Sequence, residues 1–75
     1  MSFFTQAYLL EKYGPRLRIA EVAEVLQVAE KTLRNRLSQG KVTLPMYEDQ
    51  GLRCADYRDV AAYLDDCRER ARSQA

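Results

Sequence analysis

Histidine is absent from this chain of 75 residues, and cysteine occurs only twice. Without histidine, zinc sites of the finger type and histidine-based general-base chemistry are excluded. Cys54 and Cys67 lack the Cys-x-x-Cys spacing, and although the two could pair, a small disulfide-stapled domain normally carries a denser set of cysteines. We therefore expect reduced, structural thiols, no metal site and no cofactor.

A long apolar run is also missing. No segment approaches the roughly 20 apolar residues that a membrane span requires. The opening Met-Ser-Phe-Phe lacks a basic region followed by an apolar stretch, so it does not resemble a secretory signal. Apolar residues make up 47% of the chain and charged residues 31%, which is typical of a folded globular domain. We expect one domain, residues 1–75, that is cytoplasmic and has no membrane partner.

Groups that could act together in catalysis are scarce as well. Asp65 and Asp66 are neighbours on a predicted helix, where successive side chains point about 100° apart, so they cannot easily share a metal ion or a substrate. The serines have no histidine that could serve as their base. We expect that the protein is not an enzyme.

The charge of the chain is small but unevenly distributed. A net charge of +1 argues by itself against a strongly basic nucleic-acid-binding protein. Residues 31–41, however, carry +4 with no acidic residue, and residues 67–75 carry +2, which leaves −5 for the rest of the chain. Positive charge concentrated near one helix is what a surface facing DNA phosphates needs.

The N-terminal part of the sequence predicts a short helix over about residues 5–13, with Ala7, Leu9, Leu10 and Tyr13 on or near its apolar face. Gly14 and Pro15 end this helix, and residues 17–19 form a strand stub at most. Phe3 and Phe4 are expected to cover the core. The alternative is an adhesive edge for a partner chain.

Residues 19–39 have the pattern of a helix-turn-helix. The first helix has apolar residues at i, i+3, i+4 and i+7, namely Ile19, Val22, Ala23 and Leu26. The second runs from about residue 29 to residue 39, with Gly40 as its stop and an inward stripe of Ala29, Leu33 and Leu37. Two short helices joined by a turn of about three or four residues define this motif.

The second of these helices has a polar outward face, formed by Lys31, Arg34, Asn35 and Ser38. Asn can bridge adenine N6 and N7, Arg can bridge guanine O6 and N7, and both reach phosphates. A merely solvated helix face is the alternative. Arg36 lies nearer the packed side, where it either fixes the turn or reaches a phosphate, and Lys41 is interpreted as a phosphate contact.

The remaining residues predict a hairpin and a final helix. Apolar flanks around residues 48–51 indicate a hairpin over about residues 42–55, with Pro45 on an edge strand. Asp56 caps a helix over about residues 57–70, and residues 68–75 are polar enough to fray. This helix has an inner stripe of Tyr57, Val60, Ala61 and Leu64, continued by Cys67 and Ala71. Three arginines near its end either extend the basic surface or form a solubilising tail: Arg68, Arg70 and Arg72.

Residues 17–41 resemble the MerR-like and phage excisionase winged helix-turn-helix superfamily. The shared pattern is apolar-x-apolar-x-Glu-Val-Ala, then Thr-Leu-Arg, then Gly-Lys. Scattered matches at residues 8–14, 44–45 and 59–65 look like the pyocin activator family of prophage regulators, although the hairpin is shorter here. Two departures concern the turn: Gln27 stands where the family usually has Gly, and Ala29 replaces the capping Ser or Thr.

The resemblance implies a mainly α fold with a small β-hairpin, a winged helix-turn-helix of MerR/excisionase type. It implies groove contacts by Lys31, Thr32, Arg34, Asn35 and Ser38, and wing contacts by Gln50 and Arg53. The expected function is binding of double-stranded DNA by a phage or prophage excisionase (a recombination directionality factor), a transcriptional regulator, or both. Expected partners are further copies on adjacent DNA sites and a site-specific recombinase. The alternative is a protein-interaction module that binds a recombinase or polymerase subunit without reading DNA.

Overall fold

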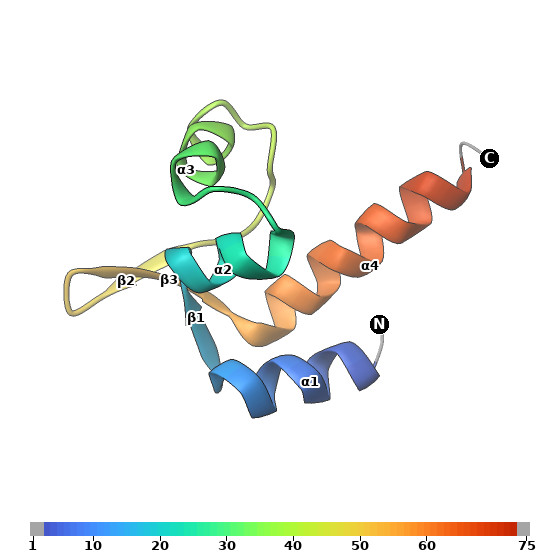
Figure 1. The fold of residues 1–75 in the computed structure, drawn as a ribbon, viewed down its shortest axis with the longest axis horizontal. Helices are drawn as coiled ribbons and strands as arrows, with labels where there is room; N and C mark the ends of the chain where they lie inside the picture. Colours follow the sequence, from blue (N-terminus) through green and yellow to red (C-terminus); the bar gives the residue numbers. More distant parts are fainter. Residues whose placement is uncertain (1–2, 74–75) are drawn as a thin grey trace.

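The computed structural model describes residues 3–73, which form four helices and one three-stranded antiparallel sheet (Figure 1). The mainly helical class with a small sheet is confirmed, and the arrangement is compatible with a winged-helix-like fold. In chain order the elements are α1 (Phe3–Tyr13), β1 (Arg16–Arg18), α2 (Ile19–Leu26), α3 (Glu30–Ser38), β2 (Tyr47–Asp49), β3 (Leu52–Asp56) and α4 (Tyr57–Ser73).

The sheet has the order β1-β3-β2, so the strand stub near the N-terminus pairs with the hairpin. Leu17 lies opposite Ala55, and both side chains are fully buried. The hairpin closes through Gln50 and Gly51, whose φ angles are 57° and 79°. Positive φ at both central residues is the geometry of a type I′ turn, which matches the twist of the flanking strands. The predicted hairpin is confirmed, and the strand stub predicted at residues 17–19 forms the third strand, β1.

The predicted start of the hairpin near residue 42 is wrong, because β2 begins only at Tyr47. Val42 and Leu44 are buried in the core, at 8% and 6% exposure, so this segment packs against the helices instead of joining the ladder. Pro45 has no backbone N–H to donate to a neighbouring strand. Residues 42–46 therefore connect α3 to the sheet without regular structure.

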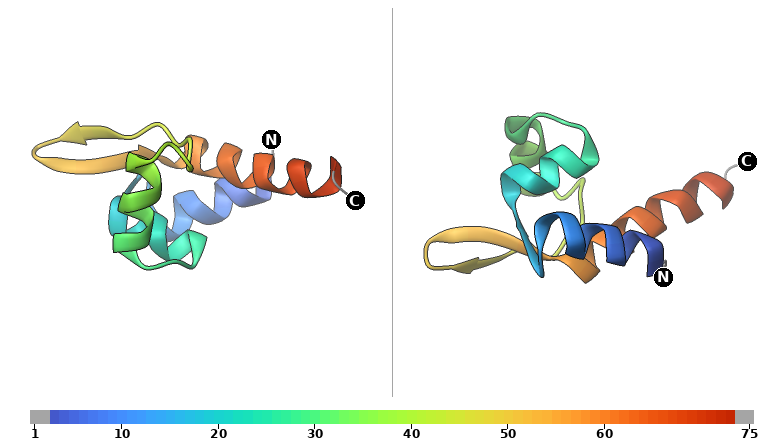
Figure 2. Two further views of the ribbon diagram at one scale, coloured as in Figure 1. Left: turned by 90° about the horizontal axis from the view of Figure 1, so that it is seen from above. Right: turned by 60° about the horizontal axis from the view of Figure 1, so that its bottom comes forward.

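One apolar core joins the four helices to the sheet. Its largest fully buried side chains each come from a different element: Leu9, Leu17, Val22, Leu33 and Val60. Helices α1 and α4 pack against each other, while α2 and α3 lie on the other side of the molecule with the hairpin projecting beside them (Figure 2). The four helices and β1 therefore each contribute one of these side chains to a shared interior.

The first helix differs from its prediction in where its apolar side chains point. It begins at Phe3 instead of near residue 5, and Leu9 is its buried residue. Ala7 and Leu10 are exposed. Phe3 and Phe4 are 85% and 90% exposed, so the expectation that they cover the core is wrong. The reason is that α1 packs through a single stripe, and the residues of its first turn lie beyond the surface that this stripe covers.

The last helix is also longer than predicted. It continues to Ser73, so the expected fraying from residue 68 is wrong as far as residue 73, and residues 74–75 lie outside the described residues. Ala71 is exposed, whereas Val60 and Ala61 are buried as expected. The inner stripe ends before Ala71 because α4 extends past the body that it packs against (Figure 1).

Within residues 3–73, no helix combines the length and the apolar character needed to cross a bilayer. Both cysteines are free thiols, with Cys54 buried and Cys67 half-buried.

Asp56 caps α4 as predicted. Its Oδ1 accepts a hydrogen bond from the backbone N–H of Arg58 at 2.8 Å, and the Arg58 guanidinium contacts both carboxylate oxygens at 3.0 Å. The hydrogen bond from the Arg58 side chain holds the pKa of Asp56 below its ordinary value of 3.8. The charged form therefore stabilises the fold above that ordinary value, and the contribution is lost as the pH falls through the depressed pKa.

We expect Asp56→Ala to lower the free energy of unfolding by about 1 kcal/mol at neutral pH, because it removes the cap. The difference from wild type should shrink on acidification, because wild-type Asp56 then becomes protonated. Urea unfolding of both proteins at neutral pH and at about pH 2 measures this change. Asp56→Asn is the control, since Asn keeps a capping oxygen at every pH. A difference between wild type and Asp56→Ala that does not change with pH would contradict the prediction.

Candidate nucleic-acid interface

The connection between α2 and α3 determines how α3 is presented. Gln27 ends α2 in the left-handed conformation, with φ 60° and ψ 42°, and the N–H of Val28 donates to the carbonyl of Ala23 at 3.0 Å. This conformation favours glycine and costs a non-glycine residue about 1 kcal/mol or more. Leu33 is fully buried and anchors the inner side of α3. The opposite side of α3 therefore faces outward.

The outward face of α3 is placed as predicted: Lys31, Arg34, Asn35 and Ser38 are all exposed. Of the predicted inner stripe, Leu33 is buried and Leu37 is half-buried, but Ala29 is exposed. The prediction that Ala29 points inward is wrong, because Ala29 stands at the cap position, with extended backbone, before the first helical turn.

The C-terminal end of α3 is well defined. The N–H of Lys41 donates to the carbonyl of Arg36 at 2.9 Å, and the N–H of Gly40 donates to the carbonyl of Leu37 at 3.2 Å. With Gly40 at φ 73°, these bonds form a Schellman motif. The motif ends the helix and leaves the Lys41 side chain exposed directly after the outward face.

The N-terminal end of α3 lacks such support, because Ala29 makes no side-chain capping bond. We expect Ala29→Ser to raise the free energy of unfolding by about 1 kcal/mol, since a serine oxygen can accept a bond from a free N–H of the first turn. Thermal unfolding should then show a midpoint roughly 4–8 °C higher. Ala7→Ser, at an exposed site inside α1, is the control and should give no gain. An Ala29→Ser protein no more stable than wild type would show that the cap position does not limit α3.

An acidic side chain lies on the face that the sequence presented as purely basic. Glu30 precedes the predicted cation-rich segment. Its Oε2 accepts a hydrogen bond from Arg34 Nε at 3.0 Å and lies 2.9 Å from Arg34 Nη2 in an ion pair. The two side chains are 44% and 49% exposed. Arg34 therefore points outward as expected but is paired, and the missed signal was the i, i+4 spacing of Glu30 and Arg34.

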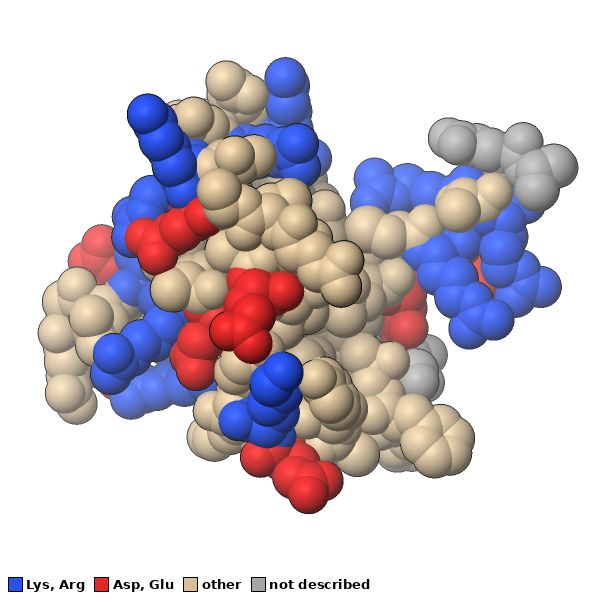
Figure 3. Space-filling view, viewed as in Figure 1, with Lys and Arg blue, Asp and Glu red and all other residues tan. Residues whose placement is uncertain are grey.

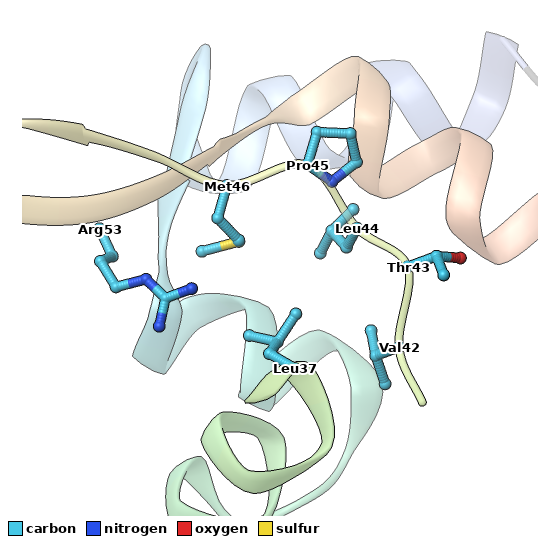
Figure 4. Close-up of a pocket in the computed structure, with 7 residues that line it drawn as sticks. All are labelled: Leu37, Val42, Thr43, Leu44, Pro45, Met46 and Arg53. Atoms are coloured by element: carbon cyan, nitrogen blue, oxygen red, sulfur yellow. The ribbon is translucent and has the colours of Figure 1, made fainter. Parts of the chain in front are cut away.

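The hairpin brings Arg53 beside α3. Arg53 and Leu37 line an open pocket of about 440 Å³ together with residues 42–46, and the Arg53 side chain extends toward α3 in Figure 4. In the sheet, Arg53 lies opposite Glu48 and two residues before Ala55, so its side chain shares the face that carries the core. Because successive side chains of a strand point to opposite faces, the Arg53 side chain points into the space between the sheet and α3.

The other predicted contact residues are placed differently. Thr32 is half-buried, and Arg36 is exposed but lines a pocket with Leu33 and Tyr63, on the side of α3 that faces α4. Gln50 is exposed at the hairpin turn, yet it lines a pocket on the opposite face of the sheet from Arg53. The structure thus places Arg53 beside Leu37 of α3 but does not bring Gln50 or Arg36 to the same place.

Two arginines of β1 were missed in the sequence. Arg16 and Arg18 are both exposed and flank the buried Leu17, and both line the pocket that contains Gln50. Arg16 is bound by Asp49 of the hairpin, which raises the pKa of the Arg16 guanidinium. The available signal was the alternation of Arg-Leu-Arg, which places two cations on one face of a strand.

The charges of the folded chain separate by region (Figure 3). Lys and Arg side chains gather over α3 and toward the hairpin, whereas Asp and Glu side chains lie mainly over α2 and α1. Of the cations on and beside α3, Arg34 is paired with Glu30, whereas four others take part in none of the ion pairs found among residues 3–73: Lys31, Arg36, Lys41 and Arg53. A second basic group lies at the far end of α4, where Arg68, Arg70 and Arg72 are exposed.

An acidic side chain of α2 links this helix to α1. Glu24 accepts a hydrogen bond from the Tyr13 hydroxyl at 2.9 Å and lies 3.5 Å from Lys12 Nζ, which ties α1 to α2. Burial of the Tyr13 hydroxyl, followed by its bond to Glu24, raises the pKa of Tyr13. Among residues 3–73, no group of three or more Cys, Asp or Glu side chains is arranged to hold a metal ion.

We define the α3 surface by four exposed residues of α3, by Lys41 in the turn that follows and by Arg53 of β3, a set that is rich in cations: Lys31, Arg34, Asn35, Ser38, Lys41 and Arg53. Comparisons with protein-family models, with curated proteins and with solved structures each found no match to this chain.

Proposed function

We propose that this protein binds double-stranded DNA as a winged helix-turn-helix module of the MerR-like and excisionase kind, with α3 in the major groove. The observation that carries the proposal is the α3 surface: its Arg and Asn side chains are exposed on one helix face, and unpaired cations lie beside them. The major groove is wide enough for an α-helix, and Arg and Asn can each make two hydrogen bonds to one base.

The hairpin supports this orientation. Arg53 extends toward α3 from the strand beside it, so a duplex that receives α3 would meet the Arg53 guanidinium at its backbone. Contacts to phosphate fix how a protein lies on the duplex, while base contacts supply the specificity. Arg53 and Lys41 are assigned to phosphates, and Arg34 and Asn35 are assigned to bases.

The biological role within this proposal is that of a phage or prophage excisionase or transcriptional regulator. A single module of this size buries about 600–1,000 Å² on DNA. We therefore propose that several copies bind adjacent sites and contact one another. The excisionase role adds a site-specific recombinase as partner.

The experiment that tests DNA binding is a gel-shift titration on random-sequence duplexes and on duplexes selected by the wild-type protein. Affinity should fall steeply between about 50 and 200 mM salt, because binding to phosphates releases counterions. Arg34→Ala and Asn35→Ala should each reduce the preference for the selected sequence, at a cost of about 1–3 kcal/mol for each lost base contact. The absence of duplex binding at low salt would overturn the proposal.

A protein-interaction module is the second candidate, and one observation favours it. Phe3, Phe4 and Tyr8 on α1 are 85%, 90% and 56% exposed, which is unusual for aromatic side chains of a small domain. An apolar protein interface would be far less sensitive to salt than a phosphate contact. The same salt titration therefore separates the two candidates.

A further inference from the structure

We propose that Glu30 is a positioning residue for Arg34, and that this pair makes the α3 surface prefer guanine to phosphate. The inference rests on the proposed DNA-binding function. Glu30 is the first residue of α3, and Arg34 lies one turn later on the same outward face. Neither side chain is part of the core, so the pair is available to a ligand.

The contact uses one edge of the Arg34 guanidinium. Nε donates a hydrogen bond to Glu30 Oε2 at 3.0 Å, and Nη2 lies 2.9 Å from the same oxygen. A guanidinium has five N–H donors in a planar fork. The terminal edge, formed by Nη1 and the second hydrogen of Nη2, therefore remains free, and this is the edge that can bind O6 and N7 of guanine together.

The same contact reduces the attraction of Arg34 for phosphate. A carboxylate within 3 Å of the guanidinium offsets its positive charge at long range, and it repels the phosphate oxygens themselves. The acceptors of guanine carry no net charge and do not meet this repulsion. Glu30 Oε1, which is not the oxygen of the two Arg34 contacts above, can in addition accept a hydrogen bond from a cytosine N4 amino group.

The ion pair with Glu30 also reduces the conformational entropy that the Arg34 side chain loses when it binds a base. A free arginine side chain loses much rotational freedom when it binds one base. Held by Glu30, the Arg34 side chain is already restricted before it meets DNA, and the outward direction of α3 fixes which base it reaches. The lysine beside it, Lys31, has no such acidic partner and suits a phosphate.

The test compares two charge-neutralising variants, Glu30→Gln and Glu11→Gln. Glu11 is exposed on α1, so the second variant makes the same change of net charge away from α3. Each protein is titrated on the duplex selected by wild type, on the same duplex with its preferred guanine replaced by adenine, and on a random-sequence duplex. We expect Glu30→Gln to bind the random duplex about two- to fivefold more tightly. Its discrimination between guanine and adenine should fall roughly fivefold or more. Glu11→Gln should leave the discrimination unchanged.

A second comparison, in the Arg34→Lys background, tests whether Glu30 affects base discrimination through Arg34. Lysine keeps the charge but lacks the planar fork, so Glu30→Gln should cost no further discrimination in the Arg34→Lys background. If Glu30→Gln lowers thermal stability, the same comparison in the Ala29→Ser background keeps the test on a folded protein. Discrimination that survives Glu30→Gln, or that falls equally in Glu11→Gln, overturns the positioning role while leaving DNA binding intact. Failure of wild type to bind any duplex overturns both.

Discussion

Leu33→Ala should lower the free energy of unfolding by about 2–5 kcal/mol, because it removes a fully buried side chain and leaves a cavity. A domain of 75 residues has a total stability of roughly 4–11 kcal/mol, so the loss is a large fraction of the whole. Leu33 is also the buried residue of α3. The orientation of the α3 surface should therefore be lost together with stability.

Urea unfolding followed by circular dichroism measures the first effect, and duplex binding under conditions where the variant remains folded measures the second. The matched control is Leu52→Ala, the same change of side chain at a residue that is 43% exposed on β3. The control should cost well under half as much as Leu33→Ala. Equal costs for the two variants would show that α3 is not anchored through Leu33.

Neutralising three unpaired cations of the α3 surface should have the largest effect on DNA affinity. We expect the triple variant Lys31→Gln, Lys41→Gln and Arg53→Gln to bind DNA on the order of 10²-fold more weakly at about 0.1 M salt. The slope of log affinity against log salt should fall by roughly 2–3, since each lost phosphate contact removes about 0.9. Titrations at several salt concentrations give both quantities.

The control for this experiment is the triple variant Arg68→Gln, Arg70→Gln and Arg72→Gln. It removes the same charge from exposed residues at the far end of α4. If these arginines are a solubilising tail, the slope of log affinity against log salt should stay within about one unit of the wild-type slope. A loss as large as that of the first variant would mean that binding follows net charge and that the α3 surface is not the contact.

Much of the local structure could be predicted from the sequence. The spacing of Ile19, Val22 and Ala23 gave α2 its buried face, and Gly40 marked the end of α3. Asp56 identified the start of α4. These predictions succeeded because each depends on contacts between residues close in the chain: helical periodicity, capping bonds and the conformations open to glycine.

The errors lie where the answer depends on distant parts of the chain. Phe3 and Phe4 are as apolar as any core residue, but no helix or strand within residues 3–73 covers them. Val42 and Leu44 are apolar enough to belong to a strand. In the structure both side chains are buried in the core, and their segment is an irregular connection between α3 and β2. Apolar character alone does not say whether a partner surface is present, because that surface comes from other elements.

The sequence by itself determined which polar residues share the outward face of α3, through residue type and helical spacing. Only the tertiary structure decided which of the predicted contact residues lie together: it set Arg53 beside α3 and placed Gln50 on the other face of the sheet. The reason is that periodicity fixes the direction of a side chain relative to its own element, whereas packing of the core fixes the elements relative to one another.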